Sequence, residues 1–544
     1  MTTTDFENNV KTLIDNLKGT CTSYGLGNDG NEFKIITQVF LYKFMNDKFA
    51  YQIKKLDKKL AQAEHWEDEL ENTSADDYEM LLLQLDADTA KLKPEHLISH
   101  LFNKQNEAEF AKLFDDTLRD IAITNNEVFS VKSASGEKDT LFDRISEFVD
   151  TDDRDNFCKA IINHLVNQSF EAIFEQKYDF YATIFEYLIK DYNKDGGGKY
   201  AEYYTPHAVA KIMAAILIPA NATEKVENVT VYDPSAGSGT LLMNIAHAIG
   251  EDRCTLYSQD ISKKSSGMLR LNLILNGLVH SIHNVIRGNT ILSPFHKEAG
   301  ELMKFDYIVS NPPFKMDFSD FRDDLDGKEN KERFFAGIPK TPKKAVDKMA
   351  IYSLFLQHII YSMADGAKAA VVVPTGFITA QAGIDKKIRQ KLVDDKMLAG
   401  VVSMPSNIFA TTGTNVSILF LDKNNKEGVV LLDASNLGET VKEDKNQRTV
   451  LTEVEEKQII NTFNQKEAVD DFSVVVSYDE IKAKNYSFSA GQYFEVKIEY
   501  VDITAKEFEA KMKGFTDNLD GLFAESKELE GEIKKQLGGV VYGD

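Results

Sequence analysis

The sequence predicts an α/β fold in which a mostly parallel sheet lies between an all-helical N-terminal domain and a C-terminal helical extension. From about residue 228 onward, short apolar runs alternate with helical patterns, which is typical of βαβ units that build a parallel sheet. Residues 1–165 show helical spacing of apolar residues with no clear strands, and the chain becomes polar and charged after about residue 435. We therefore expect domains at 1–165, 166–435 and 436–544.

The N-terminal domain is predicted from two helical patterns. The segment "DFENNVKTLIDNLK" places apolar side chains on one face, at Phe6, Val10, Leu13, Ile14 and Leu17. The segment "FKIITQVFLYKFMNDKF" has the composition of a more buried helix. Three consecutive glycines in "DYNKDGGGKYAEYYTP" indicate a domain boundary, because they do not sit comfortably inside a helix. After this boundary we expect Thr205 to cap a helix that has Pro206 at its first position.

Composition places the chain among soluble globular proteins. It has 544 residues, of which 43% are hydrophobic, and its mean hydropathy is −0.31. No apolar run approaches the length that spans a bilayer, and the N-terminus shows no secretory signal. We therefore expect a cytoplasmic protein that is not associated with a membrane. The three cysteines, Cys21, Cys158 and Cys254, lie far apart and predict neither disulfides nor a metal site.

The formal net charge of −23 limits the partners of this chain. Nucleic-acid binding rests largely on neutralising phosphates with Lys and Arg, so DNA should repel a chain this acidic. If the chain acts on DNA, a partner or a local basic patch must supply the attraction.

Six runs in the central region read as strands, and a further strand is expected before "GNT". The six runs are "VTVYDP", "TLYSQD", "FDYIVSNPP", "AAVVVPTGF", "GVVSMP" and "VSILFLDK". In an open parallel sheet the ligand lies at the carboxyl ends of the strands. The residues that follow each strand are therefore the candidates for a site.

The first strand end carries a glycine-rich turn in "DPSAGSGT". Asp233 closes the strand, Ser235 follows, and Gly237 and Gly239 flank the turn before a helix starts at Thr240. Glycines allow a ligand to approach the backbone closely, and a helix N-terminus offers N–H groups to a carboxylate. The same turn could bind a pyrophosphate or simply connect strand and helix tightly.

The next strand ends offer an acid and an amide. Asp260 can accept hydrogen bonds from a ribose diol or cap the following helix. Asn289 can pair with an adenine edge or form a turn. At the fourth end, Asn311-Pro312-Pro313 cannot continue a sheet ladder, because proline fixes φ and removes a donor. The segment Asn311–Phe314, here called the claw, predicts a stiff turn or a rigid grip on a flat group that carries an amine.

The C-terminal extension ends in a heptad-like helix from about Thr504 to Leu537. Its apolar residues step by four and three, at Phe508, Met512, Phe515, Leu519 and Leu522, and resume at Leu529 and Ile533 after Ser526. This seam predicts a helix that pairs with another chain. The alternative is an amphipathic helix folded back on its own domain.

"DPSAGSGT" followed by "NPPF" resembles the class I S-adenosylmethionine-dependent methyltransferases of the DNA adenine-N6 type. The segments "AEYYTP" and "ERFFAGIPKTPKKAVDKMAIYSLFLQHIIYSM" resemble more particularly the modification subunit of type I restriction-modification systems. The resemblance covers essentially the whole chain. It implies a Rossmann-like methyltransferase domain at 166–435 and S-adenosyl-L-methionine as cofactor.

The resemblance also implies roles for individual residues. Asp233, Gly237 and Gly239 would line the methionine moiety, and Ser235 would also belong to the cofactor site. Asp260 would hold the ribose, and Asn289 would lie at the adenine, where the family is expected to carry an aspartate. Tyr204 and Thr205 would close the cofactor pocket. Of the claw, Asn311 and Pro312 would accept hydrogen bonds from the amine of a flipped adenine, Pro313 would keep the segment rigid, and Phe314 would stack on the base.

A similar claw occurs in protein glutamine methyltransferases and some RNA methyltransferases, which remain the alternative function. For the DNA enzyme, "KENKERFFAGIPKTPKK" is the densest basic run near the site and includes Arg333, Lys340, Lys343 and Lys344. We expect it to be a mobile loop that orders over DNA and contacts phosphates, and the alternative is a solvated surface loop. Only about 50 residues separate Asp260 from Asn311, which leaves no room for a DNA-reading region. We therefore expect a separate specificity subunit as partner, together with a restriction subunit and double-stranded DNA. By resemblance, two copies of this chain would lie beside each specificity subunit.

Overall fold

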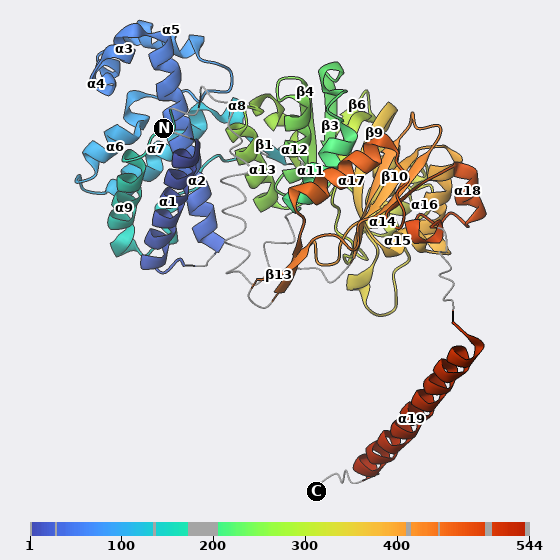
Figure 1. Cartoon of the computed structure of the whole chain (residues 1–544). Helices are drawn as coiled ribbons and strands as arrows, with labels where there is room; N and C mark the ends of the chain where they lie inside the picture. The colour runs from blue at the N-terminus through green and yellow to red at the C-terminus, as the bar shows by residue number, and fades with distance from the viewer. Residues whose placement is uncertain are drawn as a thin grey trace. The chain divides into compact units, whose positions relative to one another are not determined.

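The computed structural model describes residues 3–27, 30–133, 136, 138–171, 174, 205–409, 415–443, 446–494 and 503–538. The chain forms two compact units, Met1–Tyr493 and Phe494–Asp544. The first unit contains the N-terminal helices and a large sheet (Figure 1). The second contains one long helix.

The N-terminal region is built from helices whose predicted apolar faces are buried. Phe6, Val10, Leu13, Ile14 and Leu17 are all almost fully buried on α1, and most of α2 is buried as well, as we predicted. The helices are α1 (Thr3–Ser23), α2 (Gly30–Leu56), α3 (Lys58–Gln62), α4 (Trp66–Glu71), α5 (Ala75–Gln84), α6 (Ile98–Lys104), α7 (Phe110–Thr124), α8 (Asn126–Phe129) and α9 (Arg154–Val166).

The expectation that this region lacks strands is wrong. Two short strands, β1 (Val131–Ser133) and β2 (Lys138–Asp139), form an antiparallel pair, and β1 runs parallel to β5 (Val285–Arg287) of the central sheet. Strands of two and three residues are too short to show a period of two in the sequence. The N-terminal region therefore extends the sheet of the central region.

The sheet confirms the predicted α/β architecture. Its strand order is β15-β12-β10-β11-β9-β8-β3-β4-β5-β1-β2. Its neighbours from β9 to β5 are all parallel, whereas β11 is antiparallel to both β9 and β10. The strands not yet given are β3 (Val229–Asp233), β4 (Cys254–Asp260), β8 (Phe305–Ser310), β9 (Met363–Pro374), β10 (Leu398–Ser403), β11 (Val416–Asp422), β12 (Val429–Asp433) and β15 (Ser473–Val476).

Helices pack along this sheet (Figure 1). They are α11 (His207–Leu217), α12 (Thr240–Ile249), α13 (Lys263–Leu275), α14 (Tyr352–Ser362), α15 (Gly376–Thr379), α16 (Gly383–Asp394), α17 (Glu453–Gln465) and α18 (Tyr478–Ala483). Two small hairpins lie outside the sheet, β6 (Lys297–Glu298) with β7 (Glu301–Leu302) and β13 (Glu439–Glu443) with β14 (Asn446–Val450). The predicted cap of α11 is wrong: Pro206 occupies the N-cap position, and the Thr205 hydroxyl makes another contact, described below.

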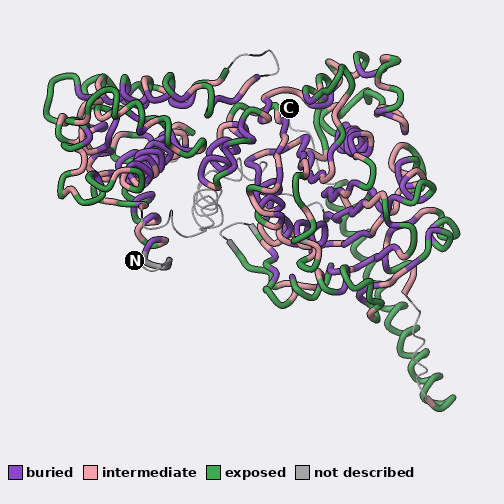
Figure 2. The backbone as a smooth tube through the Cα atoms, turned by 90° about the horizontal axis from the view of Figure 1, so that it is seen from above, coloured by how far each residue is buried: buried purple, intermediate pink, exposed green. Residues whose placement is uncertain are grey.

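The sheet extends past residue 435, where we expected it to end. Strand β15 pairs with β12, and the first compact unit continues to Tyr493. The second unit holds the predicted C-terminal helix, α19 (Ala505–Gly538), which begins with a capping box between Thr504 and Glu507. Its seam is exposed, with Phe515 at 67%, and Figure 2 draws α19 in the colour of exposed residues. No helix among the described residues is both long and apolar enough to cross a membrane.

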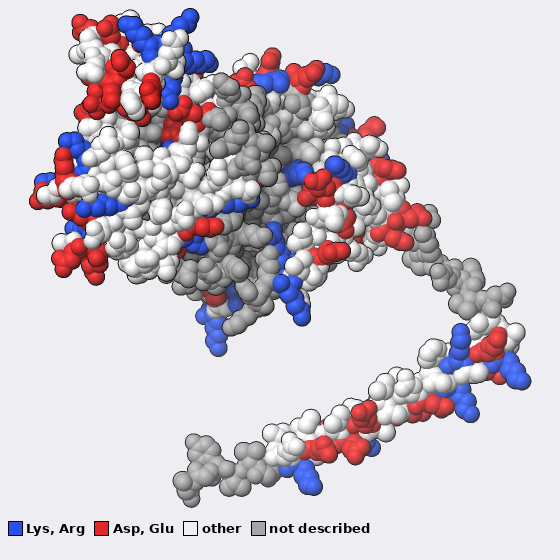
Figure 3. All heavy atoms as spheres, turned by 60° about the vertical axis from the view of Figure 1, so that its left-hand side comes forward, with Lys and Arg blue, Asp and Glu red and all other residues white. Residues whose placement is uncertain are grey.

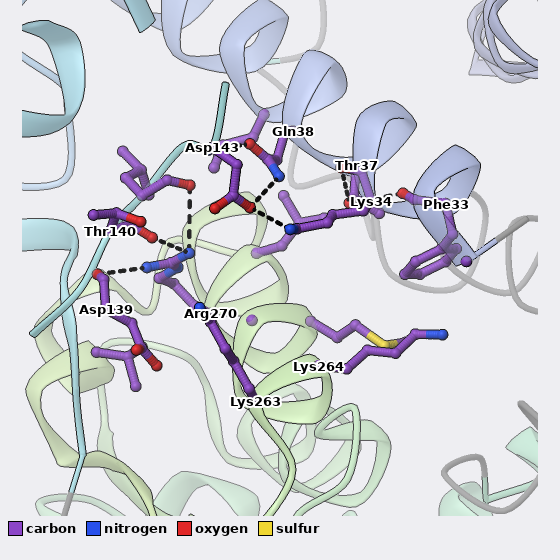
Figure 4. Close-up of a pocket in the computed structure, with 17 residues that line it drawn as sticks. Phe33, Lys34, Thr37, Gln38, Asp139, Thr140, Asp143, Lys263, Lys264 and Arg270 are labelled. Carbon is purple, nitrogen blue, oxygen red and sulfur yellow. Dashed lines mark hydrogen bonds and ion pairs between the residues drawn. The ribbon is translucent and has the colours of Figure 1, made fainter. Parts of the chain in front are cut away.

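A cavity of about 350 Å³ lies where α2, the β1–β2 hairpin and α13 meet (Figure 4). The Arg270 guanidinium donates to the carbonyls of Asp139, Thr140 and Leu141 on one side of it, and Lys34 pairs with Asp143 at 2.9 Å on another. None of the residues that we predicted for the site lines this cavity. The Arg270 contacts join α13 to the segment that starts at Asp139, and the Lys34–Asp143 pair joins α2 to the same segment.

Candidate functional site

The structure brings the predicted strand-end residues to one edge of the sheet. Strands β8, β3, β4 and β5 are consecutive parallel neighbours, so their carboxyl ends lie side by side. Asn311 follows β8, the glycine turn follows β3, Asp260 ends β4, and Asn289 follows β5. This edge is where ligands bind in open α/β sheets.

The turn after β3 is anchored by a buried carboxyl. The Ser235 amide donates to Asp233 Oδ1 at 2.9 Å, and the Ser235 and Ser310 hydroxyls lie 2.6 Å apart. Burial raises the pKa of Asp233 to about 7, and the nearby Asp260 carboxylate contributes to the rise. The ends of β3 and β8 are thus joined directly.

Both predicted glycines of this turn have positive φ, +52° at Gly237 and +86° at Gly239. A Cβ at Gly239 would lie 2.3 Å from Leu269 Cδ1 of α13. A side chain at this position would have to displace the buried Leu269 and adopt a left-handed backbone, so glycine is favoured where α12 starts against α13. The Gly237 amide donates to Asp260 Oδ2 at 2.9 Å and so connects the turn to the end of β4.

Asp260 does not cap the next helix. Ser262 is the N-cap of α13 and accepts from the Ser265 amide, while Asp260 Oδ1 accepts from the Ser262 amide at 2.8 Å. Burial raises the pKa of Asp260. Because each carboxylate oxygen can accept a second hydrogen bond, the two backbone contacts leave Asp260 able to accept from a ligand hydroxyl.

Asn289 forms a turn through its side chain. Its Oδ1 accepts from the amides of Ile291 and Leu292 at 3.0 and 3.1 Å. The Thr290 hydroxyl donates to the Pro234 carbonyl at 2.7 Å, which ties this turn to the one after β3. The side-chain oxygen of Asn289 is therefore already hydrogen-bonded. Asn289 can still donate a hydrogen bond from Nδ2 to a ligand.

The claw is oriented by a residue far away in the sequence. Asn311 Nδ2 donates to the Thr205 hydroxyl at 3.2 Å, and Thr205 is buried. With its amide nitrogen held there, Asn311 Oδ1 has no hydrogen-bond partner among the described residues. Thr205 thus supports the claw rather than a helix end. Tyr204, the other residue predicted to close the pocket, lies outside the described residues.

Phe314 packs against residues that the sequence did not single out. Its ring and that of Tyr352 form a T-shaped pair with centroids 6.3 Å apart and planes at 77°, and Tyr352 donates to Asp385 Oδ2 at 2.6 Å. Tyr352 opens α14, and Asp385 lies on α16. No spacing in the sequence links these two positions to Phe314, so only the fold reveals the support.

Two exposed apolar side chains flank the ends of β4 and β5. Ile261, directly after Asp260, is 64% exposed, and Leu292, three residues after Asn289, is 39% exposed. Apolar side chains exposed at neighbouring strand ends suit the faces of a planar ring. The sequence signal for Ile261 was its place immediately after the acidic residue.

For the basic segment after the claw, the predicted phosphate contact of Arg333 is wrong. Arg333 is only 3% exposed, and its guanidinium is bonded to other protein groups, so it is not a phosphate contact. Lys340, Lys343 and Lys344 are exposed. A basic residue cannot be recognised as buried from charge density alone.

The fold and the strand-end residues define a class I methyltransferase with an Asn-Pro-Pro-Phe claw. The family model described as N-6 DNA methylase matches residues 176–501, and the chain belongs to this family. This confirms the family resemblance, the predicted fold class and an adenine-specific DNA methyltransferase as the kind of enzyme. Among the described residues, no group of three or more His, Cys, Asp or Glu could hold a metal ion.

Known relatives extend the similarity to nearly the whole chain. The type I restriction enzyme MpnII methylase subunit of Mycoplasma pneumoniae is 25% identical over 551 residues, which cover 97% of this chain and 95% of the relative. The HindI methylase subunit of Haemophilus influenzae is 25% identical over 79% of this chain and 93% of its own. The crystal structure of a type I restriction-modification methyltransferase subunit from Streptococcus thermophilus matches with a TM-score of 0.72 at 20% identity, covering 90% of this chain and 100% of that one.

Proposed function

We propose that this chain is the modification subunit of a type I restriction-modification complex. It transfers the methyl group of S-adenosyl-L-methionine to the exocyclic amine of a flipped adenine in double-stranded DNA. The observation that carries the proposal is the claw: Asn311 is held by Thr205 through its amide nitrogen, so its oxygen is left for a substrate N–H. The similarity to methylase subunits over nearly the full length supports the type I assignment.

The claw supplies acceptors for the reacting amine. The lone pair of an adenine amine is delocalised into the ring, so the amine is a poor nucleophile. If Asn311 Oδ1 and the Pro312 carbonyl each accept one N–H, the nitrogen can rehybridise and direct its lone pair at the sulfonium methyl. Both acceptors also stabilise the positive charge that develops on the nitrogen. Pro313 limits backbone motion, and Phe314, backed by Tyr352, offers a face to the flipped base.

The strand-end residues fit S-adenosyl-L-methionine. The buried Asp233 carboxyl, with Ser235 and the glycine turn beside it, suits the charged methionine end, since a nearby ammonium would favour its ionised form. Asp260 can still accept from a ribose hydroxyl. Asn289 Nδ2 can donate to the adenine edge, with Ile261 and Leu292 against the ring faces. Thr205, and by prediction Tyr204, close the pocket beside the claw.

A separate specificity subunit would select the DNA sequence that is methylated. Positive and negative side chains are interspersed on the face of the molecule seen in Figure 3, and the net charge is −23. Such a surface offers little general attraction for phosphates. We propose that two copies of this chain, in the cytoplasm, flank one specificity subunit on DNA, that a restriction subunit joins them, and that α19 grips the partner.

The alternative is methylation of protein glutamine or of RNA by the same claw. The N-6 DNA methylase family match does not favour it. Analysis of methylated nucleosides after incubation of the co-expressed complex with labelled S-adenosyl-L-methionine and duplex DNA distinguishes the two. We expect N6-methyladenine in the DNA. Label in protein or RNA, with none in DNA, would contradict the proposal.

Replacing Lys340, Lys343 and Lys344 together by glutamine should weaken DNA binding and flatten its salt dependence. The slope of log K against log salt falls by about 0.9 for each phosphate that the protein no longer neutralises, so a change of about 2 to 3 is expected. Fluorescence anisotropy of the assembled complex at several salt concentrations measures it. The same charge change at Lys58, Lys59 and Lys91, on the N-terminal region, is the matched control. An equal slope in the lysine variant and the wild type would rule out a phosphate-binding role for the three lysines.

A further inference from the structure

Arg333 lies at the centre of the segment between the claw and α14. This segment folds over a small apolar cluster of its own, made of Ile291, Phe318, Leu325, Phe334, Met349, Ile351, Leu354 and Phe355. Ile291 belongs to the turn after β5, and the other members come from the segment and α14. The segment is thereby packed against the turn that contains Asn289.

The Arg333 guanidinium holds this turn by its backbone. Its Nη2 donates to the carbonyls of Thr290 at 2.9 Å and Ile291 at 2.7 Å. The amides of Ile291 and Leu292 are already held by Asn289 Oδ1. The turn is therefore fixed on its amide side by Asn289 and on its carbonyl side by Arg333.

A second set of hydrogen bonds fixes Arg333 itself. Its Nε donates to His358 Nδ1 at 3.1 Å, so the proton of this neutral imidazole lies on Nε2, which faces the Tyr232 hydroxyl at 3.1 Å. Burial lowers the pKa of His358 well below its ordinary value, which is consistent with the neutral ring. Tyr232 directly precedes Asp233 on β3. One network thus connects β3, α14, the segment after the claw and the turn after β5.

The charge of Arg333 has an unusual environment. Burial lowers its pKa to about 10, which still leaves it charged at neutral pH. Among the residues that the structure describes, no carboxylate pairs with it. Its hydrogen-bond partners are carbonyls, an imidazole and the Asn330 amide oxygen, and its guanidinium lies over the Phe334 ring, 4.5 Å from the centroid. A buried cation without a carboxylate is costly, so its retention needs a gain elsewhere. The planar guanidinium donates from Nη2 to two successive carbonyls, from Nε to His358 and from Nη1 to Asn330, an arrangement that the point charge of lysine cannot match.

We propose that Arg333 is a positioning residue for the cofactor: it sets the Asn289–Leu292 turn so that Asn289 and Leu292 meet the adenine of S-adenosyl-L-methionine. This inference rests on the proposed function. Arg333 itself touches neither the cofactor nor the base. Its effect should therefore fall on cofactor affinity more than on the methyl-transfer step.

The test compares the full chain with its Arg333→Gln and Arg333→Lys variants, each on its own for cofactor binding and in the complex reconstituted with the specificity subunit for kinetics. For Arg333→Gln we expect Kd and KM for S-adenosyl-L-methionine to rise at least tenfold, by isothermal titration and steady-state kinetics. The kcat at saturating cofactor should change less than threefold. Arg333→Lys keeps the charge but not the planar guanidinium, so its Kd and KM should lie between those of the wild type and those of Arg333→Gln. Arg322→Gln is the control, because Arg322 lies on the same segment and bonds Asp323, Asp326 and the Pro339 carbonyl.

Hydrogen exchange without cofactor provides an independent readout. The amides of Ile291, Leu292 and Ser293 should exchange faster in Arg333→Gln and not in Arg322→Gln. Unchanged exchange there, or unchanged cofactor affinity in both Arg333 variants, would overturn the inference. If Arg333→Gln does not fold, Arg333→Lys decides by the same two measurements. Failure of the wild-type chain to bind the cofactor would instead contradict the proposed function, and exchange would still decide whether Arg333 holds the turn.

Discussion

The Asn311→Ala variant is expected to lose methyl transfer to adenine by roughly 10²–10³-fold, the effect of removing one preorganised group that stabilises charge in a transition state. Asn311 Oδ1 is the side-chain acceptor that the claw offers to the amine. Among the described residues, the substitution removes only the hydrogen bond from Nδ2 to Thr205. The cofactor residues on β3, β4 and β5 are not altered, so S-adenosyl-L-methionine should bind as before.

Isothermal titration of the chain with the cofactor, and single-turnover methylation of duplex DNA by the complex reconstituted with the specificity subunit, measure the two parts of this expectation. Asn276→Ala is a matched control, since Asn276 is also half-buried and donates to a protein oxygen, at Asn272, but lies at the C-terminal end of α13. Turnover near the wild-type level in Asn311→Ala would contradict the claw mechanism. If Asn311→Ala loses both cofactor binding and turnover, Asn311 is required for the folded site rather than for the methyl-transfer step alone.

Truncation of the chain at about residue 500 is expected to abolish assembly with the specificity subunit and to leave cofactor binding intact. The compact unit Met1–Tyr493 contains all the predicted strand-end residues, whereas α19 belongs to the second unit. Co-purification of the truncated chain with a tagged specificity subunit, and titration with S-adenosyl-L-methionine, measure the two effects. Normal assembly of the truncated chain would show that α19 is not required to bind the specificity subunit.

A finer version of this experiment changes single faces of α19. Phe515→Glu with Leu522→Glu places two charges in the exposed apolar seam and should prevent assembly. Ala510→Glu with Ala524→Glu adds the same two charges on the opposite side of the helix, where helical geometry puts residues two positions away from the seam. Assembly should then be retained. Loss of assembly with both pairs of substitutions would show that net charge, not the seam, decides assembly.

Much of the fold could be predicted because the buried parallel strands read as continuous apolar runs. Strands β3, β4, β8, β9, β10 and β11 lie where we expected them. The short strands β1 and β2 carry too few residues for a pattern, and β15 lies in a polar part of the chain. Which strands become neighbours depends on packing between distant segments, and the sequence does not state it.

The candidate site could be predicted as an order of residues along the chain, but not as contacts. Asp233, Asp260, Asn289 and Asn311 reach the same edge because their strands are neighbours in the sheet. The contact between Asn311 and Thr205 spans 106 positions, and the burial of Arg333 depends on carbonyls about 40 residues away. Such long-range pairs leave no periodic signal. The roles of the individual site residues stay predictions that the variants above test.

The most direct test of the central claim compares the purified chain with the complex reconstituted with its specificity subunit. Both are incubated with S-adenosyl-L-methionine and genomic DNA, and N6-methyladenine is mapped along the sequence. We predict methylation by the complex at one bipartite site, on both strands, and no efficient methylation by the chain alone. Efficient methylation of one defined sequence by the chain alone would contradict the claim that a separate subunit reads the DNA. Absence of N6-methyladenine with the complete complex would contradict the proposed activity itself.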